Sequence, residues 1–304
     1  MIDKRESLRF PFILFSDAKG ECPMYAKKQN WKKWIWIAVL AVSVLLIAVS
    51  IGVMAWVYTD HGVNLDKFRK EPTEVVNNQT VQTTPQTPSE NVSDPNAPSE
   101  SAQPLLVENP IDFAALREVN SDAYAWIYVP NADIDLPIFQ ADATKDDNFY
   151  MHHDIEGNYD FKGSIYSQRA NKKDFSDPVT LLYGHRMLDK SMFTNLHNFR
   201  DDTFFEQNRY FYIYTPGHIL TYEIVSAHQY DERHILNSFN FSKPEIFQEY
   251  IDYILAPKSM IANVREGVEV TTQDHIVTLS TCMEGGSARY LVQGVLIHDE
   301  RTTE

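Results

Sequence analysis

The stretch Thr278-Leu279-Ser280-Thr281-Cys282, followed seven residues later by Arg289, decides how this chain folds and what it does. Apolar and β-branched residues at 276–281 predict a buried strand, and the apolar run at 290–297 predicts a second one. Cys282 therefore ends one strand, and Arg289 opens the next. An acyl-transfer cysteine needs access to substrate, a proton-handling partner and positive charge where the oxyanion forms. Cys282 and Arg289 provide the first and the third.

The missing base is expected to be a histidine at another strand end. Gly184-His185 follows Val179-Thr180-Leu181-Leu182-Tyr183, which also predicts a buried strand. His152-His153 is the most obvious competing pair, but neighbours on a strand point to opposite faces, so we do not expect them to share a metal. Because no cysteine or histidine cluster has zinc-like spacing, the sequence predicts no metal site.

Three motifs in this order resemble those of class B sortases. They are Tyr-Gly-His-Arg-Met at 183–187 with Ser-Met-Phe at 191–193, Thr-Leu-Ser-Thr-Cys at 278–282, and Ala-Arg-Tyr-Leu-Val at 288–292. The resemblance extends from about Ile111 to Ile297. It implies that Cys282 is the nucleophile, that His185 is the general acid and base, and that Arg289 holds the oxyanion and the substrate. It also implies that the reaction needs no metal or organic cofactor.

Each of these residues also has a plainer interpretation. Cys282 could be an inert core thiol, because free cysteine is among the most buried residue types. Arg289 could form a surface salt bridge in an acidic domain. The motifs favour the catalytic interpretation of both. Two substrate-binding residues are predicted beside them: Ser280, which points to the same strand face as Cys282, and Met151, in a segment resembling the one before the family's third strand.

The charge of the chain is unevenly distributed. Residues 1–104 hold 11 acidic and 11 basic side chains, whereas the remainder holds 31 acidic and 16 basic, so the net charge of −15 belongs to the C-terminal region. Phosphate binding requires a basic face. The composition therefore argues against nucleic acid as a partner.

The N-terminal part predicts a membrane anchor. Residues 1–33 are predicted as a cytoplasmic tail and residues 34–58 as a transmembrane helix, because these 25 residues lack charge and can cross about 30 Å of hydrocarbon. Tryptophans at 31, 34 and 36 and aromatic residues at 56 and 58 are typical of interfacial belts. A cleaved signal peptide is the alternative, but the run is long and no small-x-small cleavage site follows it.

The flanking charges predict the orientation of this anchor. Lysines at 27, 28, 32 and 33 precede the helix, so by the positive-inside rule the N-terminus is cytoplasmic and the rest of the chain extracellular. Cys22 and Cys282 would then be separated by the membrane and could not form an intramolecular disulfide. Residues 59–104 are predicted as an extracellular spacer, disordered from about residue 71, because this region is rich in polar residues and proline.

Residues 105–304 are predicted to form the catalytic domain, of the mainly β class. The segment Asn109 to Val119 predicts an amphipathic helix with Asn109 as its cap. Strands are predicted at 127–129, 134–139, 164–167, 179–183, 210–215, 219–229, 276–281 and 290–297. Eight short strands indicate a sandwich or a closed barrel. The resemblance selects an eight-stranded sortase-type β-barrel with N-terminal helices and a helix inserted between late strands.

That inserted helix is predicted from Ser242-Lys243-Pro244-Glu245, an N-cap signature followed by an apolar stripe ending at Ile254. In class B sortases a helix in this connection walls the substrate groove. Simple core packing explains the stripe equally well. No residue of the helix is therefore assigned a substrate contact.

These observations predict a membrane-anchored cysteine transpeptidase of a Gram-positive-type cell surface. By resemblance, it would cleave secreted surface proteins within a C-terminal sorting motif, at a Thr-Gly or Thr-Asn type bond. Through a thioester on Cys282, it would join the threonine carbonyl to an amine of peptidoglycan or of a pilin. Two alternatives stay open: a cysteine endopeptidase that passes the acyl group to water, and a non-catalytic surface binding module.

Overall fold

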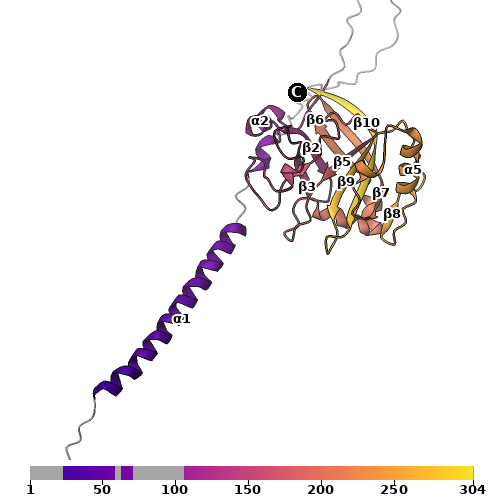
Figure 1. The fold of residues 1–304 in the computed structure, drawn as a ribbon. Helices are drawn as coiled ribbons and strands as arrows, with labels where there is room; N and C mark the ends of the chain where they lie inside the picture. The colour runs from indigo at the N-terminus through magenta and orange to yellow at the C-terminus, as the bar shows by residue number, and fades with distance from the viewer. Residues whose placement is uncertain (1–22, 59–62, 71–105, 304) are drawn as a thin grey trace, which may run out of the picture. The chain divides into compact units, whose positions relative to one another are not determined.

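The computed structural model describes residues 23–58, 63–70 and 106–303 of the chain (Figure 1). It contains two compact units, the first ending at His61 and the second beginning at Gly62. Most of the predicted cytoplasmic tail and the spacer from residue 71 to 105 lie outside the described residues.

The first unit contains one long helix, α1 (Pro23–Tyr58). Its window Trp31–Met54 has 24 residues with a mean hydropathy of 2.8, and none of that window is buried. This length and composition suffice to cross a membrane. Helix α1 is therefore a candidate membrane span.

The second unit is built around a closed eight-stranded β-barrel, as the sequence predicted (Figure 1). The strands follow the order β10-β9-β5-β4-β3-β2-β6-β7, and β10 pairs with β7 to close the ring. The barrel strands are β2 (Ala123–Val129), β3 (Ile134–Phe139), β4 (Ile165–Tyr166), β5 (Val179–Tyr183), β6 (Tyr210–Thr215), β7 (His218–Tyr230), β9 (Ile276–Cys282) and β10 (Arg289–Thr303).

Two further strands, which the sequence analysis did not predict, extend the sheet beyond the closed ring: β1 (Val107–Glu108) and β8 (Ala262–Val264). Both are too short to show a periodic apolar pattern. The short helical elements are η1 (Leu65–Phe68), α2 (Phe113–Val119), η2 (Phe149–Met151), η3 (Thr194–Arg200), α3 (Asp202–Gln207), α4 (Ile235–Ser238) and α5 (Pro244–Leu255).

Helix α2 begins later than the sequence predicted. Its N-cap is Asp112, whose carboxylate accepts a hydrogen bond from the Ala115 backbone N–H at 2.9 Å. Asn109, the expected cap, is instead buried, and its side chain accepts a hydrogen bond from the backbone N–H of Ile111 at 3.1 Å. Asn109 therefore shapes the approach to the helix rather than its first turn.

Helix α5 is the inserted helix between late strands, and it packs on the flank of the barrel opposite α2 (Figure 1). Pro244 occupies its first turn, and the N-cap is Lys243, which contributes no side-chain hydrogen bond. The apolar stripe is buried against the barrel, through Phe247, Tyr250, Ile251 and Ile254. The core-packing interpretation of these four side chains is therefore the one that the structure supports.

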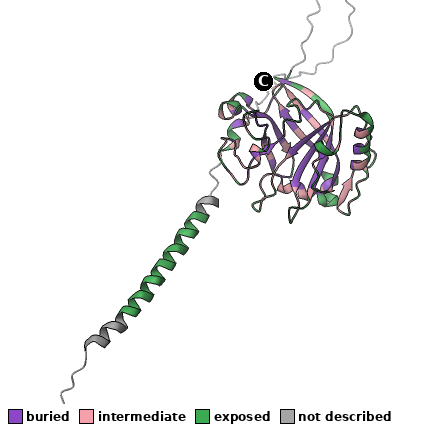
Figure 2. Ribbon diagram, in the orientation of Figure 1, coloured by how far each residue is buried: buried purple, intermediate pink, exposed green. Residues whose placement is uncertain are grey.

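The core fills the inside of the barrel and continues beneath α5 and α2 (Figure 2). The N-terminal side of this core includes residues that the sequence analysis placed in the spacer. Phe68 is only 1% exposed, and its carbonyl accepts a hydrogen bond from the Asp112 N–H at 2.8 Å. Arg69 forms an ion pair with Asp135. Residues 63–70 thus pack on the barrel domain through buried Phe68, partly buried Val63 and Leu65, and the polar contacts of the segment.

Candidate active site

Strand pairing brings the three predicted catalytic residues to one end of the barrel. Strands β5 and β9 are parallel neighbours, with Tyr183 opposite Ser280, so both strands end at the same edge. His185 follows β5, and Cys282 closes β9. Strand β10 runs antiparallel to β9, and its first residue, Arg289, lies directly opposite Cys282.

Gly184 allows the chain to turn tightly between β5 and His185. A Cβ atom at this position would lie 2.5 Å from Ile165 Cδ1 and 2.6 Å from the Phe193 ring, closer than real Cβ contacts allow. The Gly184 N–H donates to the Ser280 carbonyl at 3.1 Å, which extends the pairing with β9 by one residue. The absent side chain therefore lets His185 follow directly on the paired strand.

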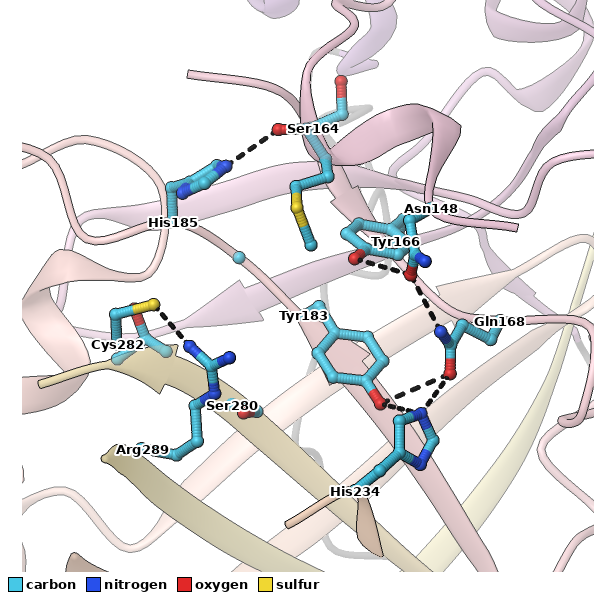
Figure 3. A pocket seen from close by; sticks show the side chains of 13 residues that line it. Asn148, Ser164, Tyr166, Gln168, Tyr183, His185, His234, Ser280, Cys282 and Arg289 are labelled. Carbon is cyan, nitrogen blue, oxygen red and sulfur yellow. Dashed lines mark hydrogen bonds between the residues drawn. The ribbon is translucent and has the colours of Figure 1, made fainter. Parts of the chain in front are cut away.

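Cys282 and Arg289 are in direct contact. The Arg289 guanidinium donates a hydrogen bond from Nη1 to the Cys282 Sγ at 2.6 Å (Figure 3). Cys282 is partly exposed, so it is not the inert core thiol that was the plainer interpretation. The contact places a permanent positive charge beside the sulfur, where an acyl-transfer site needs it.

A cavity of about 200 Å³ opens beside this pair, and its lining includes His185, Cys282 and Arg289. Ser280 and Met151, the two predicted substrate-binding residues, also line it. The structure thus brings all five predicted site residues to one pocket.

His185 is held by a backbone carbonyl that sequence reasoning missed. Its Nε2 lies 2.8 Å from the Met151 carbonyl oxygen. Since a carbonyl can only accept, Nε2 carries a proton, and Nδ1 is the nitrogen left to exchange one. Met151 therefore acts through its main chain as well as through the side chain that lines the pocket.

Aromatic rings pack around His185. The His152 ring stacks on it with centroids 5.3 Å apart, and the Phe161 ring lies 6.2 Å away on a nearly parallel plane. Burial lowers the pKa of His185 below its usual value, although the hydrogen bond to Met151 opposes this. Positive charge on His152 and on Arg289 lowers that pKa further.

The wall of the pocket away from Cys282 is a network of neutral polar groups (Figure 3). His234 Nε2 lies 2.6 Å from the Gln168 Oε1 and 3.1 Å from the Tyr183 hydroxyl. The Gln168 amide donates to the Asn148 Oδ1 at 2.8 Å. Burial lowers the pKa of His234 and raises that of Tyr183, so both remain uncharged near neutral pH.

Sequence reasoning missed this network because its members lie far apart in the chain, and only Tyr183 belongs to one of the three motifs. His234 comes from the connection between β7 and α5, whereas the helix α5 itself does not line the pocket. Uncharged donors and acceptors of this kind suit the backbone and amide groups of a peptide.

A second histidine supports the catalytic segment from the other side. His197 Nε2 lies 3.0 Å from the Cys282 carbonyl oxygen, and its ring stacks on Tyr290 at 5.1 Å. Burial lowers the pKa of His197. Within residues 23–58, 63–70 and 106–303, no three histidine, cysteine or acidic side chains are grouped as a metal site requires.

A thiol, a guanidinium and an imidazole at one end of a closed barrel define a cysteine acyl-transfer site, and comparison with known proteins identifies the family. The family model described as Sortase domain matches residues 127–297, more than half of the chain. The chain belongs to the sortase family, and it is therefore a cysteine transpeptidase.

Its similar relatives are class B sortases. The sortase B of Listeria monocytogenes is 30% identical over 187 residues, which cover 60% of this chain and 72% of that protein. The structure of Clostridium perfringens sortase B matches with a TM-score of 0.55 and 31% identity, covering 61% of this chain and 99% of that one. A Staphylococcus aureus sortase B–substrate complex matches with a TM-score of 0.54 and 26% identity, covering 63% and 86%. The class B assignment predicted from the motifs is confirmed.

Proposed function

We propose that Cys282, His185 and Arg289 transfer the acyl group of a sorting motif from one amine to another. The observation that carries this proposal is the 2.6 Å contact between the Arg289 guanidinium and the Cys282 sulfur, in a pocket that also contains His185. Positive charge at this point stabilises first the thiolate and then the negative charge that develops on the substrate carbonyl.

In the first half of the reaction, the Cys282 thiolate attacks the threonine carbonyl carbon and forms a C–S bond. Arg289 is planar and has several donors, so one nitrogen can remain near the sulfur while another binds the oxyanion. The imidazolium of His185 gives its Nδ1 proton to the leaving amine as the C–N bond breaks. The product is a thioester on Cys282, and the C-terminal peptide departs with a neutral amine.

In the second half, the acceptor amine attacks the thioester carbonyl. A new C–N bond forms, the C–S bond breaks, and His185 takes the proton that the amine loses. Cys282 returns to the thiolate beside Arg289. Met151 can accept from Nε2 throughout, since that nitrogen keeps its proton in both states of His185.

The substrate is proposed to be a secreted surface protein with a C-terminal sorting motif, cleaved at a Thr-Gly or Thr-Asn type bond. The class B family membership supports this, and the neutral polar wall of the pocket suits an uncharged peptide segment. The proposed acceptor is an amine of peptidoglycan or of a pilin. The small pocket volume of about 200 Å³ suits a few side chains of an extended peptide rather than a folded domain.

The location is proposed to be the cell membrane, with α1 as a single span, a cytoplasmic N-terminus and an extracellular catalytic domain from residue 105. The apolar window at Trp31–Met54 and the lysines that precede residue 34 support this arrangement. The spacer between α1 and the catalytic domain would carry the domain away from the lipid.

The experiment uses the full chain in detergent, incubated with a panel of sorting peptides with and without an amine acceptor, followed by intact-protein mass spectrometry. We expect a covalent acyl adduct in the wild type, none in Cys282→Ala, and a ligated product that requires the amine. Cleavage into acid products alone, with no ligation at any amine concentration, would instead indicate an endopeptidase. Cleavage retained in Cys282→Ala would overturn the assignment of the nucleophile.

A further inference from the structure

A second cavity lies on the other side of the segment that carries Cys282. Its volume is about 320 Å³, and the charged or titratable residues in its lining are Asp133, Arg186, Lys190, His197, Arg200 and Glu284. We call it the cationic pocket. Three permanent cations face two carboxylates here, whereas residues 105–304 carry 31 acidic and only 16 basic side chains. The pocket is thus a local excess of positive charge in an acidic domain.

The cationic pocket and the catalytic pocket share two short stretches of chain. His185 lines the catalytic pocket, and the next residue, Arg186, lines the cationic one. Likewise, Cys282 lines the catalytic pocket, and Glu284, two residues later, lines the cationic one. His197, on the floor of the cationic pocket, has its Nε2 3.0 Å from the Cys282 carbonyl oxygen. The two pockets therefore adjoin each other along the backbone at 185–186 and 282–284.

The cations of this pocket are weakly engaged by the protein. Arg186 pairs with Glu284 at 2.9 Å, but the Glu284 side chain is 85% exposed, and such surface pairs contribute little. Arg200 donates to the Met283 Sδ at 2.8 Å, which is only a weak acceptor, and its guanidinium lies 5.3 Å from the centroid of the Tyr290 ring, a contact that leaves its N–H donors free of any carboxylate in the described part of the chain. Lys190 has no ion pair among the described residues. The guanidinium and ammonium groups can therefore bind an anion from solution.

We propose that the cationic pocket binds a carboxylate on the amine acceptor and so places the acceptor's amine at the Cys282 thioester. The inference rests on the proposed function and names the chemical class of its second substrate: an amine that carries a carboxylate within a few bonds. Guanidinium groups bind carboxylates with matched geometry, and the three cations of the pocket outnumber its two carboxylates, so its net charge favours an anionic ligand.

The bound acceptor would complete the second half of the reaction without any further reagent. Its neutral amine attacks the thioester carbonyl, a C–N bond forms as the C–S bond breaks, and the amine proton passes to His185. The carboxylate stays on the cationic pocket and takes no part in bond making. Its role is to hold the amine close, which raises the effective concentration of the nucleophile.

The test compares acceptors that differ only in this charge. Full-length enzyme, a saturating sorting peptide and either glycylglycine or glycylglycinamide are incubated together, and the ratio of the two ligation rates is measured; triglycine and triglycinamide extend the reach. We expect the wild type to prefer the carboxylate form by roughly tenfold, equivalent to about 1.4 kcal/mol. The preference should fall as salt is raised from low to high concentration.

Substitutions then locate the preference. Lys190→Gln should reduce the ratio several-fold, and the combined Arg186→Gln, Lys190→Gln and Arg200→Gln variant should bring it close to one. Lys258→Gln, an exposed lysine that lines neither pocket, is the matched control and should keep the wild-type ratio. Because each ratio is measured within one enzyme, partial loss of folded protein in the triple variant does not alter it, and the single Lys190→Gln variant gives an independent reading.

Three results would count against the inference, and they are distinguishable. If the wild type uses both acceptors equally, the cationic pocket does not select a carboxylate, although the proposed function stands. A preference that survives in the triple variant places the selecting group elsewhere. If no amine product forms with any acceptor, the proposed function fails first and the inference falls with it.

Discussion

Two histidines of this domain, one half-buried and one fully buried, differ in how easily they can change their charge. His185, at the end of β5, has its Nε2 on the Met151 carbonyl at 2.8 Å. His228, within β7, is fully buried, with Nδ1 3.0 Å from the Ser226 hydroxyl and no partner for Nε2 among the described residues. Burial lowers the pKa of both, and that of His228 to about 4.

The difference lies in what each imidazole would meet on taking a proton. At His185 the carbonyl accepts from Nε2 in either state, so protonation leaves that hydrogen bond intact. At His228 protonation would bury a charge with one N–H unpaired, which is strongly unfavourable. His185 can therefore gain and lose a proton at one end of the barrel, whereas His228 stays neutral and fills space in the interior. The predictions below test this division.

The largest effect is expected from Arg289→Gln at the catalytic end. Removing the charge beside Cys282 should slow thioester formation by roughly 10²–10³-fold, the scale reported for removing an oxyanion donor. The melting temperature should barely change, since among the described residues the only side-chain hydrogen bond of Arg289 is the one to the Cys282 sulfur. Stopped peptide-cleavage assays and thermal unfolding measure the two quantities. A variant that loses stability and keeps its rate would make Arg289 a structural residue.

The interior histidine should give the opposite result, a change in stability and not in chemistry. The unfolded chain protonates His228 below about pH 6.5, whereas the folded protein resists protonation until about pH 4. Stability from this residue is therefore present above pH 6.5 and is lost as the pH falls to 4, by about 3 kcal/mol in all.

Denaturant unfolding of the wild type and of His228→Phe at pH 7 and pH 4 measures this. The difference in unfolding free energy between the two pH values should be smaller in the variant by that amount. Equal acid sensitivity in both proteins would mean that His228 finds a partner for its second nitrogen.

Gly184→Ala tests whether a change at the catalytic end of the barrel affects both the stability of the fold and the rate of the reaction. The added methyl group would meet Ile165 and the Phe193 ring, so overpacking should destabilise the fold by about 1–3 kcal/mol. It should also displace His185, lowering the rate of thioester formation at temperatures where the variant is folded. Gly52→Ala in α1, where nothing lies within 4 Å of the added carbon, is a control for adding a methyl group at a glycine. A rate unchanged in Gly184→Ala would show that the turn tolerates the shift.

The smallest effect is expected at His152. The electrostatic interaction with His152 lowers the pKa of His185, so His152→Phe should raise that pKa while keeping an aromatic ring in the stack. Because the proposed reaction needs the thiolate of Cys282 and the protonated imidazole of His185 together, the pH–rate profile should be bell-shaped. The limb on which His185 loses its proton should move to higher pH in this variant. His152→Ala would change both the charge and the stacking. An unmoved limb in the phenylalanine variant would mean that His152 acts only through its ring.

Much of the fold follows from local patterns in the chain. The apolar runs that predicted β5, β9 and β10 are long enough to identify a buried strand, and their ends placed His185, Cys282 and Arg289 correctly relative to one another. The strand β8 and the segment at 63–70 were missed because their burial depends on partners distant in the chain. The apolar pattern of such a short segment does not show which distant residues will pack against it.

The site was predictable only in part for a similar reason. Residue types and motifs identify a thiol, an imidazole and a guanidinium. No sequence pattern shows that the Met151 carbonyl accepts a hydrogen bond from His185. The neutral wall formed by Gln168 and His234, and the cationic pocket, are assembled from loops that the barrel brings together. Such sites depend on tertiary contacts and are absent from any single stretch of sequence.

The pairing of strands at the catalytic end has a further consequence, for how the activity depends on an intact barrel. Cys282 and Arg289 are seven residues apart on one hairpin, so their contact is local and needs little chain closure. His185 reaches them only through the parallel seam between β5 and β9, a long-range pairing. Loosening that seam would separate the proton carrier from the thiol while leaving the thiol–guanidinium pair together. The complete acyl-transfer site therefore exists only in the closed barrel, and a partly open chain would retain a reactive sulfur without the means to release its product.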